Sequence, residues 1–420
     1  MTICTTAFAS LGRAQATALG YPDLPLAVIP HPLSNRTRDA VRSISFTCAE
    51  EIARLACNVD ADDGITVADA AAVSERPRRI EVESDPHSIN LLYRERRWAD
   101  GLPAFASTEA AVAQMLRHTT SRAGEIVGRI APGFGAATIE TIAVNAVIAG
   151  CEPEYLPILI AAVEAVTAPP FNLQGVQTTT DPVAVWLIVN GPIVQRFGLN
   201  AGAGCLGQGT WANATLGRAL RLILQNIGGA LPGAMDRATQ GQPGKYTFCC
   251  AENEAASPWP SLHVERGFAK DDSTVTVVAA EGTMNMHTYA KNAGDILRVF
   301  SDTMAHGPSN EYVHGGEPWL VVCPEHAEIL HTAGYSKADV KRRLWEQSRM
   351  SASRMAPEDL GRAQASRTIA LGKITTETLL TIAPDPDTIA LLVAGGPGAH
   401  TMYVPSFGNT RSVTRRIGRC

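Results

Sequence analysis

Three observations predict an α/β protein. Short apolar runs typical of strands, such as Val183–Val189, Thr274–Ala279 and Ile389–Ala394, occur between longer runs with helical periodicity. The chain has 420 residues, 45% of them hydrophobic and 18% charged, which is enough for two or three domains with cores of their own. Strands that alternate with helices favour a parallel or mixed sheet covered by helices.

The first sixty residues have the pattern of an incomplete α/β unit. Strands are expected at Thr2–Thr5 and Leu26–Pro30, each followed by a helix, at Phe8–Leu19 and at Arg38–Ala56. Two strands are fewer than an α/β layer normally contains. We therefore expect residues 1–62 to form a partial Rossmann-like, doubly wound unit that the rest of the chain or another chain completes.

The remaining chain divides into a linker and a large domain. Residues 63–95 are rich in Asp, Glu and Arg, which is typical of a linker. Residues 96–420 are expected to form a larger α/β domain with a mixed sheet and a possible subdivision near 250–270. No internal repeat of fixed period is visible. Further elements are expected as helices at Thr108–His118, Ala136–Ala149, Leu156–Ala168 and Ala212–Gln225, and as a strand at Trp319–Val322.

Charge and composition argue against nucleic-acid and membrane partners. The net charge is −5, so no broad positive field is available for a phosphate backbone. The arginines at positions 411, 415, 416 and 419 are more typical of a solvated tail than of an RNA contact. The most apolar stretch, Ile139–Val166, is interrupted by Glu152, Pro153 and Glu154, which disfavours a membrane span.

The cysteines indicate a reducing compartment. Nine of them occur at irregular spacings with no CxxC motif, and Met1–Leu19 lacks the features of a secretory signal. We therefore expect a cytoplasmic protein with mostly free thiols.

Two candidate catalytic residues lie in the N-terminal unit. Cys4 ends a predicted strand just before a helix, where the helix dipole lowers the pKa of a thiol. The alternative is a small buried residue. His31 stands between two prolines after the next strand and is expected at the same edge, unless it is only a turn residue bonded to the backbone.

Two glycine loops could bind an anion or a substrate. Gly202, Gly204 and Gly207 form a GxGxxG pattern before a helix, with Cys205 inside it as a possible nucleophile. About a dozen residues separate this loop from the preceding strand, and no acidic residue stands at the ribose position, which argues against a dinucleotide site. Gly395 and Gly396 directly follow a strand, with His400 as a possible acid or base. A tight turn forced by packing explains that second loop equally well.

The densest polar segment runs from Lys245 to Arg266. Glu252 and Glu254 alternate, so an extended backbone would direct them to the same side. Together with His263 they are candidates for acid–base catalysis or for a metal site of mixed nitrogen and oxygen ligands. Candidate substrate-binding residues in the same segment are Lys245, Asn253 and Arg266. The alternative is a charged surface loop, and the identity of any metal or cofactor stays unknown.

Much of the chain resembles the UGSC family, which takes its name from a selenocysteine- or cysteine-Gly-Ser-Cys signature. Ile3–Thr5, the small-residue helix through Ala18 and Leu26–Asn35 are similar to the C-terminal end of protein B of the glycine, sarcosine and betaine reductases. Stretches similar to the C-terminal region of longer UGSC-type proteins are Ala149–Glu154, Gly244–Phe248, Glu252–Glu254, Leu262–Gly267, Pro324–His326 and Gly395–Gly398.

The resemblance implies a function and a partner. In protein B of glycine reductase the related unit cleaves a carbon–nitrogen bond by capturing carbon on selenium. For this chain it implies thiol-assisted chemistry of carbon–nitrogen, carbon–sulfur or carbon–selenium bonds in a small-molecule substrate. In the family the signature lies upstream of the strand that contains Cys4. We favour a split subunit whose partner carries that signature; the alternatives are a misassigned start of the chain or loss of the signature. The N-terminal unit would then help to build the edge of the active site, and the chain would work as an oligomer.

Two other functions stay open at this stage. The chain could be a non-catalytic subunit that binds and stabilises a partner, which the missing signature favours and the polar, glycine-bracketed residues between 198 and 316 oppose. It could also be a metal-dependent lyase or hydrolase that acts alone.

Overall fold

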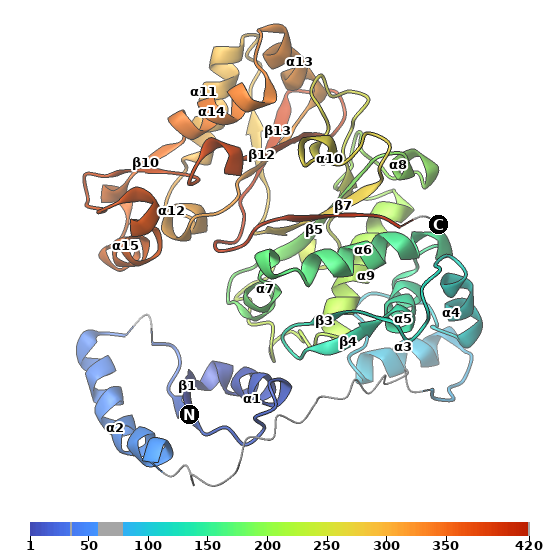
Figure 1. Ribbon diagram of the computed structural model, residues 1–420, viewed down its shortest axis with the longest axis vertical. Coiled ribbons are helices and arrows are strands. Elements are labelled where there is room, and N and C mark those ends of the chain that lie inside the picture. Colours follow the sequence, from blue (N-terminus) through green and yellow to red (C-terminus); the bar gives the residue numbers. More distant parts are fainter. Residues whose placement is uncertain (34–35, 58–78, 419–420) are drawn as a thin grey trace.

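Two four-stranded mixed sheets form the centre of the protein in a computed structural model that describes residues 1–33, 36–57 and 79–418 (Figure 1). The predicted α/β class is confirmed. The first sheet has the strand order β6-β5-β7-β14, and the second has β12-β9-β13-β8. Their bounds are β5 Ala184–Asn190, β6 Cys249–Ala251, β7 Thr274–Ala280, β14 Val413–Arg416, β8 Met284–His287, β9 Trp319–Val322, β12 Ala390–Val393 and β13 His400–Val404.

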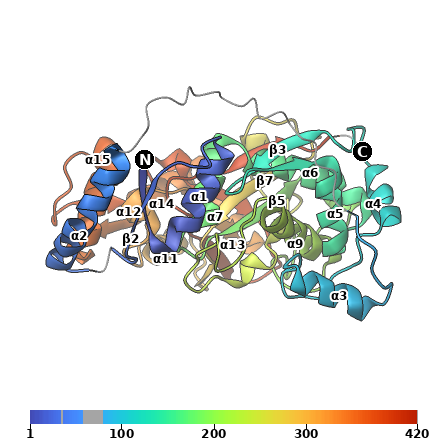
Figure 2. The ribbon, with the colours of Figure 1, turned by 90° about the horizontal axis from the view of Figure 1, so that it is seen from below.

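The two sheets face each other through an apolar layer. Trp186 of β5 and Trp319 of β9 meet edge to face, with ring centroids 5.7 Å apart, and both side chains are fully buried. Alternate residues of the same strands face outward, because successive side chains of a strand point to opposite sides. Leu187 thus packs in the cluster that contains α5, α6 and α9, and Leu320 packs in the cluster that contains α11 and α14. Figure 2 shows these two sets of helices on opposite sides of the protein.

The two sheets have the same topology. In each, a parallel pair (β5 with β6, β9 with β12) is followed by two antiparallel neighbours (β7 and β14, β13 and β8). Strands β5, β6 and β7 belong to the first sheet, but the chain then crosses and adds β8 to the second. Strands β9, β12 and β13 belong to the second sheet, and β14 returns to the first. The chain therefore contains a structural repeat with exchanged last strands, which no sequence period revealed.

Helices complete the large domain, together with two small antiparallel strand pairs. The pairs are the hairpin β3 Ile126–Ile130 with β4 Gly135–Thr138, and β10 Arg349–Ser351 with β11 Leu379–Thr381. The helices are α3 Pro86–Glu95, α4 Glu109–Leu116, α5 Ile139–Ala149, α6 Leu156–Val166, α7 Leu173–Thr178, α8 Ile193–Arg196, α9 Trp211–Asn226, α10 Leu262–Glu265, α11 Ala293–Met304, α12 Asn310–His314, α13 Pro324–Thr332, α14 Lys337–Gln347 and α15 Pro357–Leu371.

The N-terminal unit is a two-stranded parallel sheet with two helices. Strand β1 (Thr2–Thr5) pairs with β2 (Leu26–Ile29), α1 (Ala9–Ala18) connects them, and α2 (Arg38–Cys57) follows. All four elements were predicted within a few residues. Among the described residues each strand has only one partner, so each has an unpaired edge. A cavity of about 400 Å³ lies between the strands and α2, lined by apolar side chains that include Ile3, Ile29 and Ile52.

Two segments differ from the simplest interpretation of the sequence. Helix α3 lies within the expected linker, yet its Ile89 and Tyr93 are buried in the core of the large domain. The first part of that expected linker, residues 63–78, lies outside the described residues. Arg415 and Arg416 belong to strand β14 instead of a solvated tail, because Val413 on the same strand joins the core.

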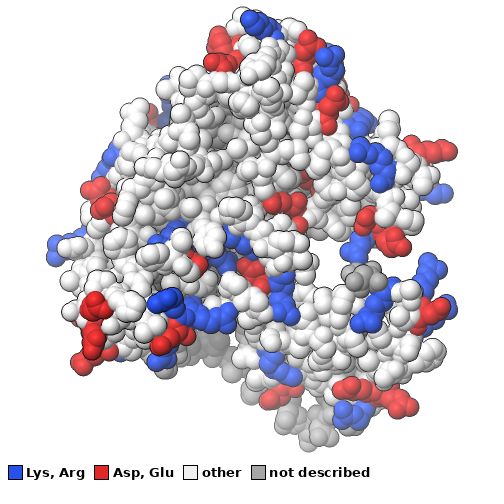
Figure 3. Space-filling model, turned by 180° about the vertical axis from the view of Figure 1, so that it is seen from behind, with Lys and Arg blue, Asp and Glu red and all other residues white. Residues whose placement is uncertain are grey.

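Within the described residues no single helix has the length and hydrophobicity to cross a bilayer, although one bent pair, Pro153–Val166 with Pro169–Thr178, passes that test by length and composition. Figure 3 shows charges of both signs scattered over one face, in agreement with the small net charge.

Candidate functional site

The carboxyl ends of the two parallel strand pairs meet at one end of the sandwich. Just after β6, Asn253 donates its backbone N–H to the carbonyl oxygen of Val393 in β12, at 2.8 Å. After β12, Gly395 donates its N–H to the carbonyl oxygen of Ala201, also at 2.8 Å. Carboxyl ends of parallel strands are where α/β proteins commonly bind ligands. The repeat thus brings together loops that lie almost 200 positions apart in the sequence.

The glycine loop around Cys205 packs against the loop after β12. A Cβ atom on Gly396 would lie 2.7 Å from the Cβ of Ala203, so only glycine permits this approach. Gly204 has φ +69° and Gly395 has φ +100°, both in the left-handed region that favours glycine. The candidate residues Gly202, Gly204, Gly207, Gly395 and Gly396 are therefore brought together as two facing loops.

Asn213, in the first turn of α9, holds the glycine loop in place. Its side-chain amide donates to the carbonyl oxygens of Asn200 at 2.9 Å and Cys205 at 3.0 Å. Its side-chain oxygen accepts the N–H of Asn200 at 2.9 Å. Asn213 is 4% exposed, so these bonds are shielded from water. Sequence patterns gave no signal for this residue, because a buried Asn at a helix start resembles any other polar residue.

The thiol of Cys205 lies beneath this loop and faces a second thiol. The side chain of Cys250 hydrogen-bonds the Cys205 sulfur, which lowers the pKa of Cys205, and burial opposes this effect. The backbone N–H groups of Cys205, Leu206 and Gly395 lower the pKa further, and the Gly395 N–H also donates to the carbonyl oxygen of Ala201. The partner Cys250 is fully buried, and its pKa is raised well above the ordinary value by the same hydrogen bond and by burial. A negative charge in this pair is therefore stabilised on Cys205.

Glu252 and Glu254 converge on Asn190 at the end of β5. The Asn190 side-chain amide donates to Glu252 Oε2 at 2.6 Å and to Glu254 Oε1 at 3.1 Å. Glu252 Oε2 also accepts the N–H of Leu262, and Glu254 Oε1 accepts the N–H of Gly191, both at 2.7 Å. Burial raises the pKa of Glu252, whose side chain is 2% exposed, and nearby Lys337 opposes this shift. Glu252 is therefore a carboxyl group that holds a proton more readily than an exposed one.

His263 lies beside Glu254 but is committed to other bonds. Its Nδ1 is 3.1 Å from Ser261 Oγ and 3.8 Å from Glu254 Oε1, and its Nε2 is 3.3 Å from the carbonyl oxygen of Lys270. Both ring nitrogens are thus occupied. Among the described residues, no group of three or more His, Cys, Asp or Glu side chains is arranged to hold a metal ion. The predicted grouping of Glu252, Glu254 and His263 exists in space, but its geometry does not favour a metal site.

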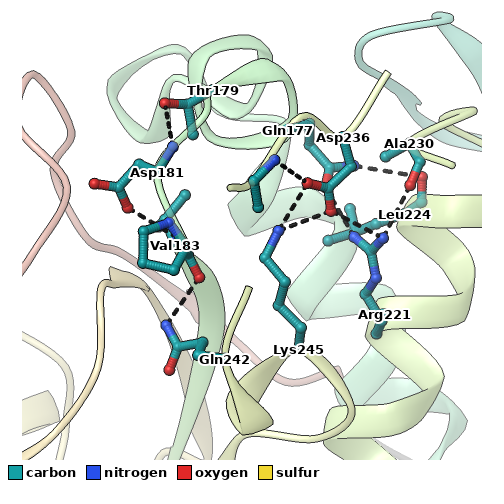
Figure 4. A network of polar contacts seen from close by, with 12 residues as sticks. Gln177, Thr179, Asp181, Val183, Arg221, Leu224, Ala230, Asp236, Gln242 and Lys245 are labelled. Atoms are coloured by element: carbon teal, nitrogen blue, oxygen red, sulfur yellow. Dashed lines mark hydrogen bonds and ion pairs between the residues drawn. The ribbon is translucent and has the colours of Figure 1, made fainter. Parts of the chain in front are cut away.

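Three other candidates lie in separate surroundings. Lys245 pairs with Asp236 at 2.7 Å, and Arg221 reaches the same carboxylate at 3.3 Å (Figure 4). Arg266 is held by Thr414, Ser412 and Glu317, and its guanidinium lies 5.3 Å from the ring centre of Trp319. His400 stacks on His287 at 4.8 Å on the exposed side of the second sheet. The first two connect packed strands and loops, and their charged groups are held by neighbouring side chains.

Cys4 and His31 both lie at the carboxyl end of the N-terminal sheet, as predicted. His31 Nδ1 is 3.0 Å from Thr5 Oγ1, its backbone N–H donates to Thr6 Oγ1, and its ring meets Phe8 edge to face. Cys4 faces α1, where its sulfur would lie 3.7 Å from a Cβ on Gly12. No hydrogen bond joins Cys4 to His31 in the described part of the chain.

A second group of carboxyls, of which Glu311 is buried and Asp181 and Glu281 are half-buried, lies at the opposite end of the sandwich and has no signal in the sequence. Asn310 donates to Asp181 at 2.8 Å and to Glu281. Burial and the neighbouring Asp181 raise the pKa of Glu281 to about 9. Next to it, Tyr403 donates to Glu311, and burial raises the pKa of Glu311 to about 8.

Comparison with protein families gives one match. Residues 1–58 match the model of the UGSC family. Comparison with curated proteins and with solved structures gives no match. The N-terminal unit of this chain is therefore similar to the UGSC family, in agreement with the resemblance seen in its sequence.

Proposed function

We propose that this chain is an enzyme subunit for thiol-assisted chemistry of carbon–heteroatom bonds in a small molecule, with Cys205 as the nucleophile. The observation that carries the proposal is the environment of the Cys205 sulfur. The side chain of Cys250 and the backbone N–H groups of Cys205, Leu206 and Gly395 all lower the pKa of this thiol, against the opposing effect of burial. Lowered thiol pKa values under such donors are typical of reactive cysteines.

The two glycine loops supply the means of approach. Ala203, Gly204, Gly207 and Gln208 are exposed, while the Cys205 side chain beneath them is 7% exposed. Glycine backbones let a small substrate come close to the sulfur, and their free N–H groups suit an anionic group of that substrate. A carboxylate-bearing small molecule is the substrate class that this surface would take.

The reaction would be a displacement at carbon. The electron pair of the Cys205 thiolate forms a sulfur–carbon bond, and the pair of the carbon–nitrogen, carbon–sulfur or carbon–selenium bond leaves with the heteroatom. The leaving group then takes a proton. No electrons are gained or lost overall in this step, so it needs no oxidant or reductant.

Glu252 is the best candidate for the proton donor. The backbone is still extended at this position, because Glu252 N–H donates to the carbonyl oxygen of Val189. Cys250 and Glu252 are two positions apart and so point to the same side, about 6–7 Å apart along the strand. The raised pKa of Glu252, caused by burial, favours the protonated form that a general acid requires.

The proposal includes a second chain at the N-terminal unit. Both strands of that unit have unpaired edges among the described residues, and such edges pair readily with another strand. Large apolar side chains are exposed around them, with Ile3 at 49% and Phe46 at 80%. The family match over residues 1–58 supports a partner that carries the Cys/Sec-Gly-Ser-Cys half of the same unit. Cys4 and His31 would then contribute to an edge shared with that partner.

Alkylation of the cysteines as a function of pH tests the role of Cys205. Iodoacetamide should modify Cys205 with a midpoint below that of an ordinary cysteine, because the thiolate is the reactive form. Cys151 and Cys249 serve as internal controls, since burial raises the pKa of Cys151 to about 12 and that of Cys249 still higher. A folded protein in which Cys205 reacts no faster than these two would exclude it as the nucleophile.

A second measurement separates an enzyme from a stabilising subunit. In the complex with its partner, Cys205→Ser should abolish turnover of the substrate, whereas Cys249→Ser should leave it unchanged. A stabilising subunit would retain the partner's turnover in both variants.

A further inference from the structure

We infer that a pocket beside the start of α6 is a binding site for a small molecule that carries a primary ammonium group. The pocket has a volume of about 370 Å³, which is in the range of pockets that hold small ligands. It lies between the end of α4, the turn from α5 to α6, and the end of α8. Its polar and aromatic lining residues are His118, Glu152, Glu154, Tyr155, Arg196 and Phe197. The site goes beyond the proposed reaction, because its lining does not include the residues around the reactive thiol.

The turn that carries the two glutamates is fixed by its backbone. Gly150 ends α5 with φ +87°, in the left-handed region, and its carbonyl oxygen accepts the Nε1–H of Trp211 at 2.9 Å. A Cβ atom on Gly150 would lie 2.7 Å from the ring of Phe105, so only glycine fits there. The N–H of Tyr155 donates to the carbonyl oxygen of Glu152 at 3.0 Å. The backbone of this turn is therefore in place before a ligand arrives, which lowers the entropic cost of binding.

The carboxylates of Glu152 and Glu154 have no partner in the described part of the chain. Glu152 immediately precedes the 3-10 turn Pro153–Tyr155, yet its side chain makes no capping hydrogen bond. Both side chains are exposed, and neither forms an ion pair with a described Lys, Arg or His. Two carboxylates and the guanidinium of Arg196 leave the lining with a net formal charge of −1 when His118 is neutral. A cation is the complementary ligand for such a lining.

Tyr155 supplies a hydroxyl group that the described residues leave unused. Its side chain is 7% exposed, and within the described ranges its hydroxyl forms no hydrogen bond. The oxygen is not one of the fully enclosed polar atoms, so the ring is buried while the hydroxyl still opens to the pocket. Buried tyrosines normally direct this group at a partner. Burial raises the pKa of the Tyr155 hydroxyl, and the negative charges of Glu152 and Glu154 raise it further, so all three groups belong to one electrostatic environment.

Tyr155 and Phe197 form an aromatic wall of the pocket. Their ring centroids are 5.4 Å apart with an angle of 53° between the planes, and the side chain of Phe197 is 8% exposed. The guanidinium of Arg196 lies 5.1 Å from the ring centre of Phe197. The wall offers apolar contact to the carbon chain of a ligand, beside the oxygens that would bind its charged end.

A primary ammonium group fits these features best. It has three N–H donors, which match the oxygen acceptors of Glu152, Glu154 and Tyr155, and hydrogen bonds between an ammonium group and carboxylates are strong. A metal ion fits less well, because the described residues contain no group of three or more His, Cys, Asp or Glu side chains arranged to hold one.

Calorimetric titration of the purified full chain with 1,4-diaminobutane tests the site. The diamine should bind at one site, whereas 1,4-butanediol, which has the same carbon chain without charge, should not bind. The double variant Glu152→Gln, Glu154→Gln should weaken binding of the diamine about tenfold or more, and Tyr155→Phe should weaken it about three- to tenfold. Glu164→Gln removes an exposed carboxylate near the other end of α6 and should leave binding unchanged.

A third probe, 4-aminobutanoate, distinguishes two sources of the ammonium group. Binding tighter than that of the diamine, and lost in Arg196→Gln, would identify the ligand as an amino acid whose carboxylate meets the guanidinium. Weaker binding would identify it as a simple amine. Either result supports recognition of the ammonium end.

Four outcomes would overturn the inference. They are absence of diamine binding, equal binding of the diol, undiminished binding in the folded double variant, and undiminished binding in Tyr155→Phe. The last would reduce the effect to loose attraction between the diamine and surface carboxylates. The readout is binding to the chain alone, so its failure leaves the proposal for Cys205 standing.

Discussion

Asn190 donates its side-chain amide to both Glu252 and Glu254, at 2.6 and 3.1 Å, and so holds two carboxyl groups at the end of a buried strand. The side chain of Asn190 is fully buried, so water cannot replace these bonds. This one amide therefore determines where the proposed proton donor lies relative to β5.

Removal of that amide should destabilise the protein. In Asn190→Ala both carboxyl groups lose a donor in a buried place, which costs about 1–3 kcal/mol of unfolding free energy. Urea unfolding at neutral pH measures the change. The control Asn285→Ala removes an exposed amide and should stay within about 0.5 kcal/mol of the wild type. Equal unfolding free energies of the two variants would show that the hydrogen bonds of Asn190 do not stabilise the folded protein.

Glu281 should make the protein less stable as the pH rises. Burial and Asp181 raise its folded-state pKa to about 9, above the ordinary 4.5, so the folded state binds the proton more tightly than the unfolded state. Its contribution is complete below about pH 4.5 and is lost as the pH rises towards 9. Glu281→Gln should flatten the decline of unfolding free energy between pH 5 and 9, whereas Glu358→Gln, at an exposed site on α15, should not. An unchanged slope in Glu281→Gln would contradict this explanation.

Gly396 should not tolerate a side chain. In Gly396→Ala the new Cβ would lie 2.7 Å from Ala203, so one of the two glycine loops must move, at a cost of about 1–3 kcal/mol. The displaced loop should also change the rate at which iodoacetamide modifies Cys205. Gly361→Ala is the matched control, because its Cβ meets open space on a helix and should stabilise by about 0.5–1 kcal/mol. Unchanged Cys205 alkylation in a destabilised Gly396→Ala would mean that the loops do not control access.

The partner proposal predicts a hetero-oligomer. Native mass spectrometry of this chain, co-expressed with the products of neighbouring genes, should detect a complex with a chain that carries the Cys/Sec-Gly-Ser-Cys half. The double variant Ile3→Ser, Phe46→Ser should lose that complex while the chain stays folded. Ile369→Ser removes a fully exposed isoleucine of α15 and should leave the complex intact. A homo-oligomer alone, with no second chain bound, would contradict the proposal.

Local patterns predicted most elements but not how the strands are arranged. Apolar runs revealed β5, β7, β9 and β12, and helical periodicity revealed α9, because each buries a continuous face. Strand β6 has only three residues, and β8 and β14 join sheets far from their neighbours in sequence, so no local signal marks them. The exchanged repeat depends on which strands pair with each other, and the hydrophobic periodicity of a strand does not specify its partner.

The site was predicted in part for the same reason. Glycines at positions 202, 204, 395 and 396 are visible in any sequence, but their approach depends on a contact between loops almost 200 positions apart. Cys250 was overlooked because nothing local distinguishes it from Cys249, although the two point to opposite faces. Lys245 was grouped with Glu252 because the two lie close in the sequence. In the structure its carboxylate partner is Asp236, in the preceding loop.

The exchange of β8 and β14 has a consequence for the way the protein is made. The first sheet obtains its edge strand from residues 413–416, which are synthesised long after its neighbour β7. A nascent chain that has emerged only as far as residue 300 therefore exposes one flank of β7 and holds β8 without its neighbour β13. Neither half can mature independently, so the two cores should melt together in a single cooperative transition, and truncations within the second half should aggregate instead of leaving a folded first half.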